Sequence, residues 1–308
     1  MSKQAWVFPG QGSQTLGMLS ELAAEYTVIQ ETFAQASEVL GYDLWELIQN
    51  DEEKLNQTHI TQPAILAASY AIYKLLLERN QGQPAFMAGH SLGEYSALVC
   101  AGVISFADAL KLVEARGQFM QQAVPAGVGA MYAIIGLDDD KVVASCEQAQ
   151  KDTAEVIAAV NFNSPGQVVI AGNKKAAEVA ANLCKEHGAK RALPLAVSVP
   201  SHCALMKPAA EQLAGLLKDI QFNVPNVPVI NNVDVAYPND PIAIKKALVE
   251  QLYSPVRWTE TVTKLADLEV ETLLEVGPGK VLTGLTKRID KRLSCTAINT
   301  VDTINSLI

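Results

Sequence analysis

The sequence predicts an α/β protein with a mostly parallel sheet and a smaller inserted domain. Along most of the 308 residues, short apolar runs alternate with helical stretches, as they do in parallel α/β proteins. Between residues 126 and 197 the predicted order changes to β-α-β-β-α-β, which is the ferredoxin-like pattern. We therefore expect residues 1–125 and 198–308 to form a core, and residues 126–197 to form an inserted ferredoxin-like domain.

Each predicted element is an apolar run or a helical stretch that ends at turn-forming residues. The first strand stops at the Pro-Gly pair of residues 9–10, and two strands of the insert are joined across NSPG at residues 163–166. In the core, the predicted strands cover residues 4–8, 85–89, 227–233, 272–276 and 296–301, and the predicted helices cover 21–40, 63–79, 92–102 and 106–123. In the insert, the predicted strands cover residues 129–137, 157–161, 167–172 and 191–197, and the helices cover 139–150 and 174–187.

The composition excludes several classes of protein. Apolar residues make up 49% and charged residues 19%, which is too apolar for a disordered chain. A net charge of -9 argues against a general nucleic-acid binder. We find no apolar run near the ~18 residues of a membrane span and no signal-peptide core at the start. Five scattered cysteines indicate reduced thiols, so we expect a cytoplasmic protein.

A candidate nucleophile lies in the sequence GHSLG at residues 89–93. This sequence follows an apolar strand and opens a helix rich in small residues, which is the context of a nucleophile elbow. Ser91 would sit on a strained turn, where flanking glycines let neighbouring backbone pass closely. The free N–H groups of the helix N-terminus would lie where an oxyanion develops. The alternative, a serine that only caps the helix, explains Ser91 but not both glycines.

A serine nucleophile needs a base, and the chain has four histidines. His90 adjoins the serine and should point away from it, while His59 and His187 occupy ordinary surface or capping positions. His202 follows a predicted strand on a loop restricted by Pro200, and such strand-end loops carry the chemistry of α/β folds. Elimination therefore favours His202 as the base.

The sequence does not single out a third member of a triad. Asp234, Asp267 and Glu275 are candidates for an acid that orients the histidine, but none has a distinguishing context. Cys203 is expected to be a small buried residue rather than a second nucleophile. Because the cysteines and histidines do not supply four ligands at a recognised spacing, we expect no metal site.

Two further glycine-rich loops follow predicted strands. FPGQGSQ at residues 8–14 begins like a dinucleotide-binding fingerprint, but Thr15 stands where the third glycine belongs and no ribose-binding acid follows. A loop of free amides beside the serine, as half of an oxyanion hole, is the better use. EVGPGK at residues 275–280 is a tight turn that opens a helix.

Arg116 is unusual because it interrupts an apolar helix face. Ala109, Val113, Arg116 and Met120 share one side of the predicted helix 106–123. Such an arginine either extends its head group to solvent or meets an anion. In an enzyme that transfers an acidic acyl group, it would bind the free carboxylate through two hydrogen bonds.

Eight motifs, spread in order from near the N-terminus to about residue 290, carry a family resemblance. They are FPGQGSQ (8–14), GHSLGEYSALV (89–99), VEARGQFMQ (113–121), NFNSPGQVVIAG (161–172), SVPSHCALMKPA (198–209), NNVDV (231–235), QLYSPVRW (251–258) and EVGPGKVLTGL (275–285). Together they resemble the bacterial malonyl-CoA:acyl carrier protein transacylases of type II fatty acid synthesis. The resemblance to acyltransferase domains of polyketide and type I fatty acid synthases is looser.

The resemblance implies a fold and a set of functional residues. The fold is an α/β-hydrolase-like core with a ferredoxin-like insert and an active site in the cleft between them. The residues at matching motif positions are the acylated Ser91, the general base His202, the histidine-holding backbone carbonyl of Gln251, the oxyanion-hole amides of Gln11 and Leu92, and the malonyl-binding Arg116. The sequence VPSH at residues 199–202 is that of the malonyl-specific bacterial enzymes.

The resemblance also implies the substrates and the partner. Malonyl-CoA would acylate the serine, and the phosphopantetheine thiol of acyl carrier protein would accept the malonyl group in a ping-pong reaction, with no bound cofactor and a monomeric enzyme. Carrier proteins of this pathway are acidic, so docking on this acidic chain needs a local basic patch. Candidates are Lys190, Arg191, Lys287 and Arg288, with the pair at 291–292, although they are also typical of solvated helix faces.

Three other functions are alternatives. A serine esterase or thioesterase would share the nucleophile, but the missing acid and the isolated Arg116 argue against it. A docking module without catalysis should have lost Ser91 or His202, and both are present. A nucleotide-binding oxidoreductase does not fit Thr15 or the absent ribose-binding acid.

Overall fold

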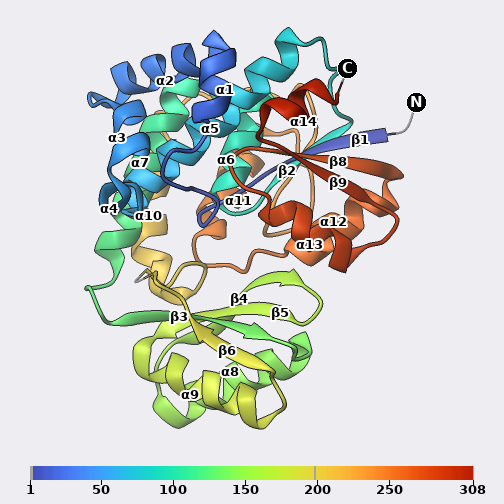
Figure 1. Ribbon diagram of the computed structural model, residues 1–308. Coiled ribbons are helices and arrows are strands. Elements are labelled where there is room, and N and C mark those ends of the chain that lie inside the picture. The colour runs from blue at the N-terminus through green and yellow to red at the C-terminus, as the bar shows by residue number, and fades with distance from the viewer. Residues whose placement is uncertain (1–2, 198, 308) are drawn as a thin grey trace.

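The computed structural model describes residues 3–197 and 199–307, and it contains two separate sheets (Figure 1). The larger sheet is parallel throughout and has the order β7-β2-β1-β8-β9, whereas the smaller sheet is antiparallel with the order β4-β5-β3-β6. The strands of the large sheet are β1 (Lys3–Phe8), β2 (Phe86–Gly89), β7 (Val229–Ile230), β8 (Val270–Val276) and β9 (Ser294–Ile298). Those of the small sheet are β3 (Gly129–Ile135), β4 (Ile157–Ser164), β5 (Gln167–Asn173) and β6 (Arg191–Pro194).

Helices cover both sheets (Figure 1). The small sheet carries α8 (Asp139–Thr153) and α9 (Lys174–Glu186), which pack against each other and against its strands. The helices before the insert are α1 (Ser20–Glu25), α2 (Thr27–Leu40), α3 (Leu44–Asn50), α4 (Glu52–Leu55), α5 (Thr58–Glu78), α6 (Leu92–Cys100) and α7 (Phe106–Ala123). After the insert follow the 3₁₀ turn η1 (Ala204–Met206), α10 (Lys207–Leu217), α11 (Pro241–Gln251), α12 (Trp258–Asp267), α13 (Val281–Ile289) and α14 (Val301–Asn305).

The first strand shows how the large sheet is buried on both faces. Trp6 and Phe8 belong to an extensive core shared with α2, α5, α6 and α7, while Ala5 and Val7 face a second core formed with α12 and α13. Alternate residues of a strand point to opposite faces, and a parallel sheet covered by helices on both sides buries all of them. The continuous apolar run at the start of the chain is therefore the signature of a central strand.

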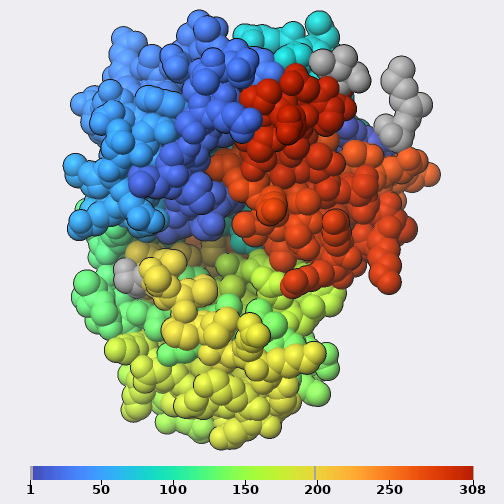
Figure 2. All heavy atoms as spheres, in the orientation of Figure 1, coloured from blue at the N-terminus to red at the C-terminus, as the bar shows by residue number. Residues whose placement is uncertain are grey.

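The predicted fold class is confirmed, because a mostly parallel sheet and a separate β-α-β-β-α-β unit are both present. In Figure 2 the insert forms the lower part of the molecule in green and yellow, below the blue and red segments of the core. The exact division into core and insert stays a prediction, and its boundary residue 198 lies outside the described residues.

Several predicted elements have different bounds. The single helix expected at 21–40 is divided at Tyr26, whose backbone is extended, into α1 and α2. The helix expected from residue 63 already begins at Thr58, so Pro63 lies inside α5. The strand expected at 227–233 pairs only over Val229–Ile230, because the two asparagines that follow turn away into a loop. The strand expected to reach residue 197 ends at Pro194.

One expectation about membranes needs correction. Among the described residues, α5 is long and apolar enough to cross a membrane, with a mean hydropathy of 1.3 over an 18-residue window. However, 78% of that window is buried inside the protein, and the core helix of a soluble protein passes the same test. The five cysteines are all free thiols, as expected.

Candidate active site

Ser91 lies on the tight turn between β2 and α6. Its backbone has φ 51° and ψ −108°, a conformation that non-glycine residues rarely adopt, so the strained turn predicted from the sequence is present. The flanking glycines are required by close packing. A Cβ on Gly93 would collide with the carbonyl of Phe8, and one on Gly89 would overlap the backbone of Gly93. The two glycines therefore let β1, β2 and α6 approach closely enough to present the serine at the sheet edge.

His202 is the histidine that reaches the serine. Its Nε2 lies 2.8 Å from Ser91 Oγ, and its Nδ1 lies 2.7 Å from the backbone oxygen of Gln251. Because a carbonyl oxygen only accepts, Nδ1 carries the proton and Nε2 offers its lone pair to the serine hydroxyl. Burial, and then the positive charge of Arg116, lower the pKa of His202 to about 3. The imidazole is therefore neutral near pH 7 and able to accept a proton.

Arg116 on α7 is buried beside this pair, with only 1% of its surface exposed. Its Nη1 donates to Gln62 Oε1 at 2.9 Å, and its Nη2 donates to Gln251 Oε1 at 2.9 Å and to Ser91 Oγ at 3.3 Å. These partners are neutral, and within the described residues the guanidinium has no carboxylate within 4.0 Å and no partner for Nε. The side chain does not extend to solvent, so the solvent-exposed alternative is wrong.

The serine, histidine and arginine face a cavity of about 110 Å³ between the large sheet and the insert. Gln11, from the loop after β1, and Leu92, at the start of α6, also line it. The backbone N–H groups of these two residues have no hydrogen-bond partner in the part of the chain that the structure describes. Free amides beside a serine can stabilise the oxyanion of a tetrahedral intermediate. The cavity thus brings together a serine hydroxyl, a neutral imidazole, a guanidinium and two free amides.

The comparison with protein families shows which family the chain belongs to. The model of the acyl transferase domain family matches residues 5–300. The chain belongs to this family. The groups just described suit acyl transfer, since a serine beside a neutral histidine can carry an acyl ester and free amides can hold the oxyanion.

Relatives of this acyltransferase match over essentially the whole chain. The chain is 64% identical over 309 residues to the malonyl CoA-acyl carrier protein transacylase of Haemophilus influenzae. The match covers 100% of this chain and 98% of the relative. A crystal structure of an acyl carrier protein S-malonyltransferase from Vibrio cholerae is 63% identical, with a TM-score of 0.97 and full coverage of both chains. A malonyl-transacylase solved in complex with a type II PKS acyl-carrier protein is 59% identical, with a TM-score of 0.97, covering 99% of this chain and 98% of that one.

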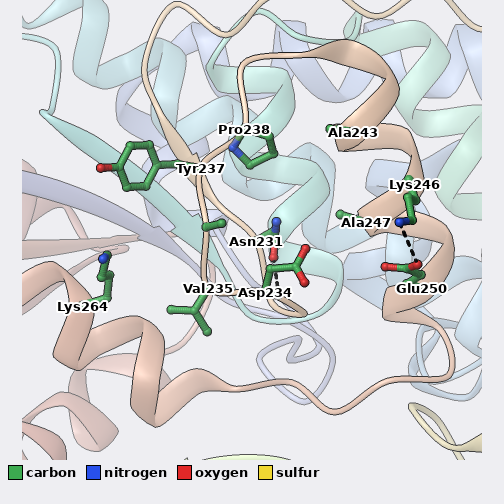
Figure 3. A pocket seen from close by; sticks show the side chains of 11 residues that line it. Asn231, Asp234, Val235, Tyr237, Pro238, Ala243, Lys246, Ala247, Glu250 and Lys264 are labelled. Carbon is green, nitrogen blue, oxygen red and sulfur yellow. Dashed lines mark hydrogen bonds and ion pairs between the residues drawn. The ribbon is translucent and has the colours of Figure 1, made fainter.

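The acids considered from the sequence do not reach the histidine of this acyltransferase. Asp267 is exposed and pairs with Arg292, and Glu275 is buried but accepts from the first backbone N–H groups of α13. Asp234 is exposed and lines a different, open pocket of about 510 Å³ together with Lys246 (Figure 3). The histidine is therefore held by a backbone carbonyl, and no carboxylate among residues 3–197 and 199–307 contacts it directly.

The other three histidines have partners elsewhere. His90 Nε2 lies 2.8 Å from Asn163 Oδ1, so its ring points toward the insert rather than toward the serine hydroxyl. His59 pairs with Gln121 and His187 with Ser145. Within the described ranges, no group of three or more His, Cys, Asp or Glu side chains could hold a metal ion.

Two buried polar residues beneath the serine were missed by the sequence reading. Glu94 on α6 is 2% exposed, and Asn232 in the loop after β7 is fully buried. A helix whose residues are otherwise all apolar or small is buried on every side, so an acid within it must also be buried and needs partners. That signal was available in LGEYSALVC at residues 92–100, whereas the position of Asn232 depends on tertiary structure.

Proposed function

We propose that this chain is a malonyl-CoA:acyl carrier protein transacylase that works through a malonyl ester on Ser91 and supplies malonyl groups for chain elongation in fatty acid synthesis. The observation that carries the proposal is the buried guanidinium of Arg116, which has neutral partners and lies 3.3 Å from Ser91 Oγ. A free carboxylate on the acyl group, as in malonyl, would supply a counter-charge in direct contact, which the neutral hydrogen-bond partners do not. The names of the relatives support the same substrate and acceptor.

In the first half-reaction, Ser91 Oγ attacks the thioester carbonyl while His202 Nε2 takes its proton. The amides of Gln11 and Leu92 bind the oxyanion of the tetrahedral intermediate. When this intermediate collapses, the carbon–sulfur bond breaks and the coenzyme A sulfur takes the proton back from the imidazolium. Malonyl-Ser91 and free coenzyme A result, and His202 is neutral again.

In the second half-reaction, the phosphopantetheine thiol of the carrier protein replaces coenzyme A. The thiol gives its proton to His202 Nε2 and its sulfur attacks the ester carbonyl. Collapse breaks the bond to Ser91 Oγ, which recovers the proton, and malonyl-carrier protein leaves. A second cavity of about 250 Å³ shares Gln11 and Asn161 with the serine cavity and extends to α13, which offers a path for the phosphopantetheine arm. The reaction requires no bound cofactor.

The carrier protein is proposed to dock at α13. Lys287 and Arg288 lie in the last turn of α13, whose first turn borders the second cavity, and Arg288 Nη1 donates to Gln167 Oε1 at the same rim. Arg191 lies at the far end of β6 from Leu195, about 13 Å along the chain from the site. We therefore favour the pair on α13 over Lys190 and Arg191.

The test is intact-protein mass spectrometry after brief mixing with malonyl-CoA. The wild-type protein should gain a malonyl-sized adduct that acyl carrier protein discharges, and Ser91→Ala should gain none. Steady release of coenzyme A into water without an adduct would instead indicate a thioesterase and would contradict the proposal.

A further inference from the structure

The strained turn at Ser91 is held by the side chain of Asn232. Asn232 Oδ1 accepts from the backbone N–H of Ser91 at 2.7 Å, and its Nδ2 donates to the backbone oxygen of Gly89 at 2.7 Å. The side-chain amide of Asn232 thus bonds both to Gly89, before the turn, and to Ser91, at the turn. A backbone conformation of this kind persists only where its surroundings hold it in place, so the orientation of the Asn232 amide matters for where Ser91 Oγ points.

A second side chain, that of Gln251, joins the base to the cation. The backbone oxygen of Gln251 accepts from His202 Nδ1, and its side-chain Oε1 accepts from Arg116 Nη2. Its Nε2 donates to the backbone oxygen of Ser91 at 3.1 Å and to Glu94 Oε2 at 2.8 Å. Gln251 therefore touches all three groups of the proposed chemistry.

Glu94 is the residue on which both of these supports converge. It follows Ser91 by three positions on α6, and one oxygen atom, Oε2, accepts from Gln251 Nε2 and from the backbone N–H of Asn232 at 3.0 Å. The carboxyl group is buried at the centre of the assembly and contacts neither His202 nor the cavity. Its hydrogen bonds reach the reacting groups only through these two neighbours, while its charge also interacts through space with the Arg116 guanidinium.

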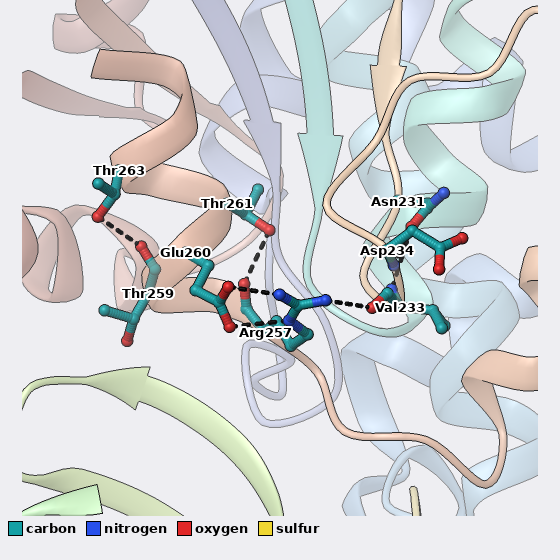
Figure 4. Close-up of polar contacts among 8 residues, drawn as sticks. All are labelled: Asn231, Val233, Asp234, Arg257, Thr259, Glu260, Thr261 and Thr263. Carbon is teal, nitrogen blue, oxygen red and sulfur yellow. Dashed lines mark hydrogen bonds and ion pairs between the residues drawn. The ribbon is translucent and has the colours of Figure 1, made fainter. Parts of the chain in front are cut away.

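The loop that carries Asn232 is also fixed from the outside (Figure 4). Asn231 Oδ1 accepts from the backbone N–H groups of Val233 and Asp234, and Arg257 Nη1 donates to the Val233 oxygen at 2.9 Å. These contacts hold the path of the loop, but they do not touch the Asn232 side chain. The backbone N–H of Asn232 instead donates to Glu94, on the buried side of the loop.

We propose that Glu94 is a positioning residue for the acyl transfer proposed above, on which this inference rests: its side-chain oxygen holds Asn232 and Gln251 and thereby aligns the Ser91 turn with the His202 imidazole. The position of the oxygen, rather than the charge, is what the site uses. Burial raises the pKa of Glu94 to about 7, so its neutral form is readily reached near physiological pH. A neutral side chain with an oxygen at the same place should therefore serve.

Three substitutions separate position from charge. Glu94→Gln keeps the length and an oxygen that accepts both hydrogen bonds, but removes the charge. Glu94→Asp keeps the charge but withdraws the oxygen by about 1.5 Å, one carbon–carbon bond. Glu94→Ala removes both. As a control for lost stability, Ile29→Ala deletes fully buried apolar volume on α2, outside this network.

The measurement is the single-turnover rate constant for acylation of Ser91 by malonyl-CoA, per folded molecule, together with KM. We expect Glu94→Gln and Ile29→Ala to stay within about threefold of wild type. Glu94→Asp should lose about 10- to 100-fold, because misplacement by about 1 Å can cost 100-fold in rate. The loss should appear in the rate constant more than in KM, since Arg116 remains to bind the carboxylate.

Two results would overturn the proposal. One is a Glu94→Asp protein that acylates as fast as Glu94→Gln or faster, which would assign the role to the charge. The other is a Glu94→Asp rate within threefold of wild type. The comparison of Gln with Asp decides the question even if Glu94→Ala does not fold. Wild-type protein that forms no malonyl adduct would contradict the proposed function itself, so the two failures are distinguishable.

Discussion

Loops at the carboxyl edge of the parallel sheet place polar groups in the cavity. The antiparallel sheet contributes mainly side chains that line one side of the cavity. From the core come the hydroxyl of Ser91 and the free amides of Gln11 and Leu92. From the insert come Met131 on β3 and Asn161 on β4. In the proposed mechanism the core therefore supplies the chemistry, and the insert limits the space beside it.

The difference follows from the two kinds of sheet. All strands of a parallel sheet end at the same edge, so their following loops converge there. Each face of an antiparallel sheet presents alternate side chains of every strand, and here α8 and α9 cover one face. The other face presents apolar side chains such as Val160 and Val169, packed with Cys203, which is next to His202 in the sequence. It can shape the site but offers few groups for proton transfer.

The largest expected effect tests this division directly. His202→Ala should lower the acylation rate by about 10²- to 10⁴-fold, because a positioned general base contributes that much. Met131→Ala, on the insert, should cost about tenfold or less and act mainly on KM. Single-turnover kinetics with malonyl-CoA would measure both. A loss for Met131→Ala as large as that for His202→Ala would contradict the division between the two regions.

Arg116 sharpens the comparison, because its proposed carboxylate-binding role would assign selectivity as well as chemistry to the core. Arg116→Ala should reduce malonyl transfer by roughly 30- to 5,000-fold, equivalent to the ~2–5 kcal/mol lost when a buried charge pair is broken. The same variant should accept acetyl-CoA better than wild type does, since no unpaired guanidinium is left beside an uncharged acyl group. The ratio of kcat/KM for the two thioesters is the measurement. Equal losses for both substrates would contradict a carboxylate-binding role.

Much of the core site could be predicted because its signals are local. The sequence GHSLG between an apolar strand and a small-residue helix predicts the turn that the structure shows at Ser91. The helical period correctly placed Arg116 on the same face as Ala109, Val113 and Met120, all of which are buried. The helical period does not predict whether the guanidinium of Arg116 faces solvent or an anion. Its surroundings depend on the side chains that α5 and α11 place around it.

The supports of the site could not be predicted, because they join distant parts of the chain. Glu94 and Asn232 are 138 residues apart, and their contact depends on α6 lying beside the loop after β7. The sequence predicted a strand through residue 233, which would have placed neighbouring asparagines on opposite faces. The strand stops at Ile230 instead, and the following turn directs Asn232 inward.

The carrier surface offers a comparison between the same two regions. Reversing two charges on α13, with Lys287→Glu and Arg288→Glu, should raise KM for acyl carrier protein about tenfold and leave KM for malonyl-CoA unchanged. Reversing Lys190 and Arg191 on the insert should change neither constant by more than about twofold, since they lie at the far end of β6. Steady-state kinetics with both substrates would measure this. The opposite ranking would place docking on the insert.

The smallest expected effect concerns stability and pH, and it arises from two of the buried titratable groups of the core, His202 and Glu94. The pKa of His202 is lowered by burial to about 3, so between pH 3 and 6.5 the unfolded state binds a proton there that the folded state does not. The pKa of Glu94 is raised by burial to about 7, so between pH 4.5 and 7 the folded state binds the extra proton. The first group makes the protein less stable on acidification and the second makes it more stable.

From pH 6 to pH 5 these two contributions nearly cancel in the wild-type protein. Glu94→Gln removes one of them, so its free energy of unfolding should fall on acidification by about 1 kcal/mol per pH unit more than that of wild type. His202→Asn should deviate by a similar amount in the opposite direction. Burial also lowers the pKa of His90, which is present in all three proteins and whose charge contributes to the lowered pKa of His202. Urea unfolding at pH 5 and pH 6 would measure the slopes, and parallel slopes for all three proteins would show that neither group titrates between the folded and unfolded states as described.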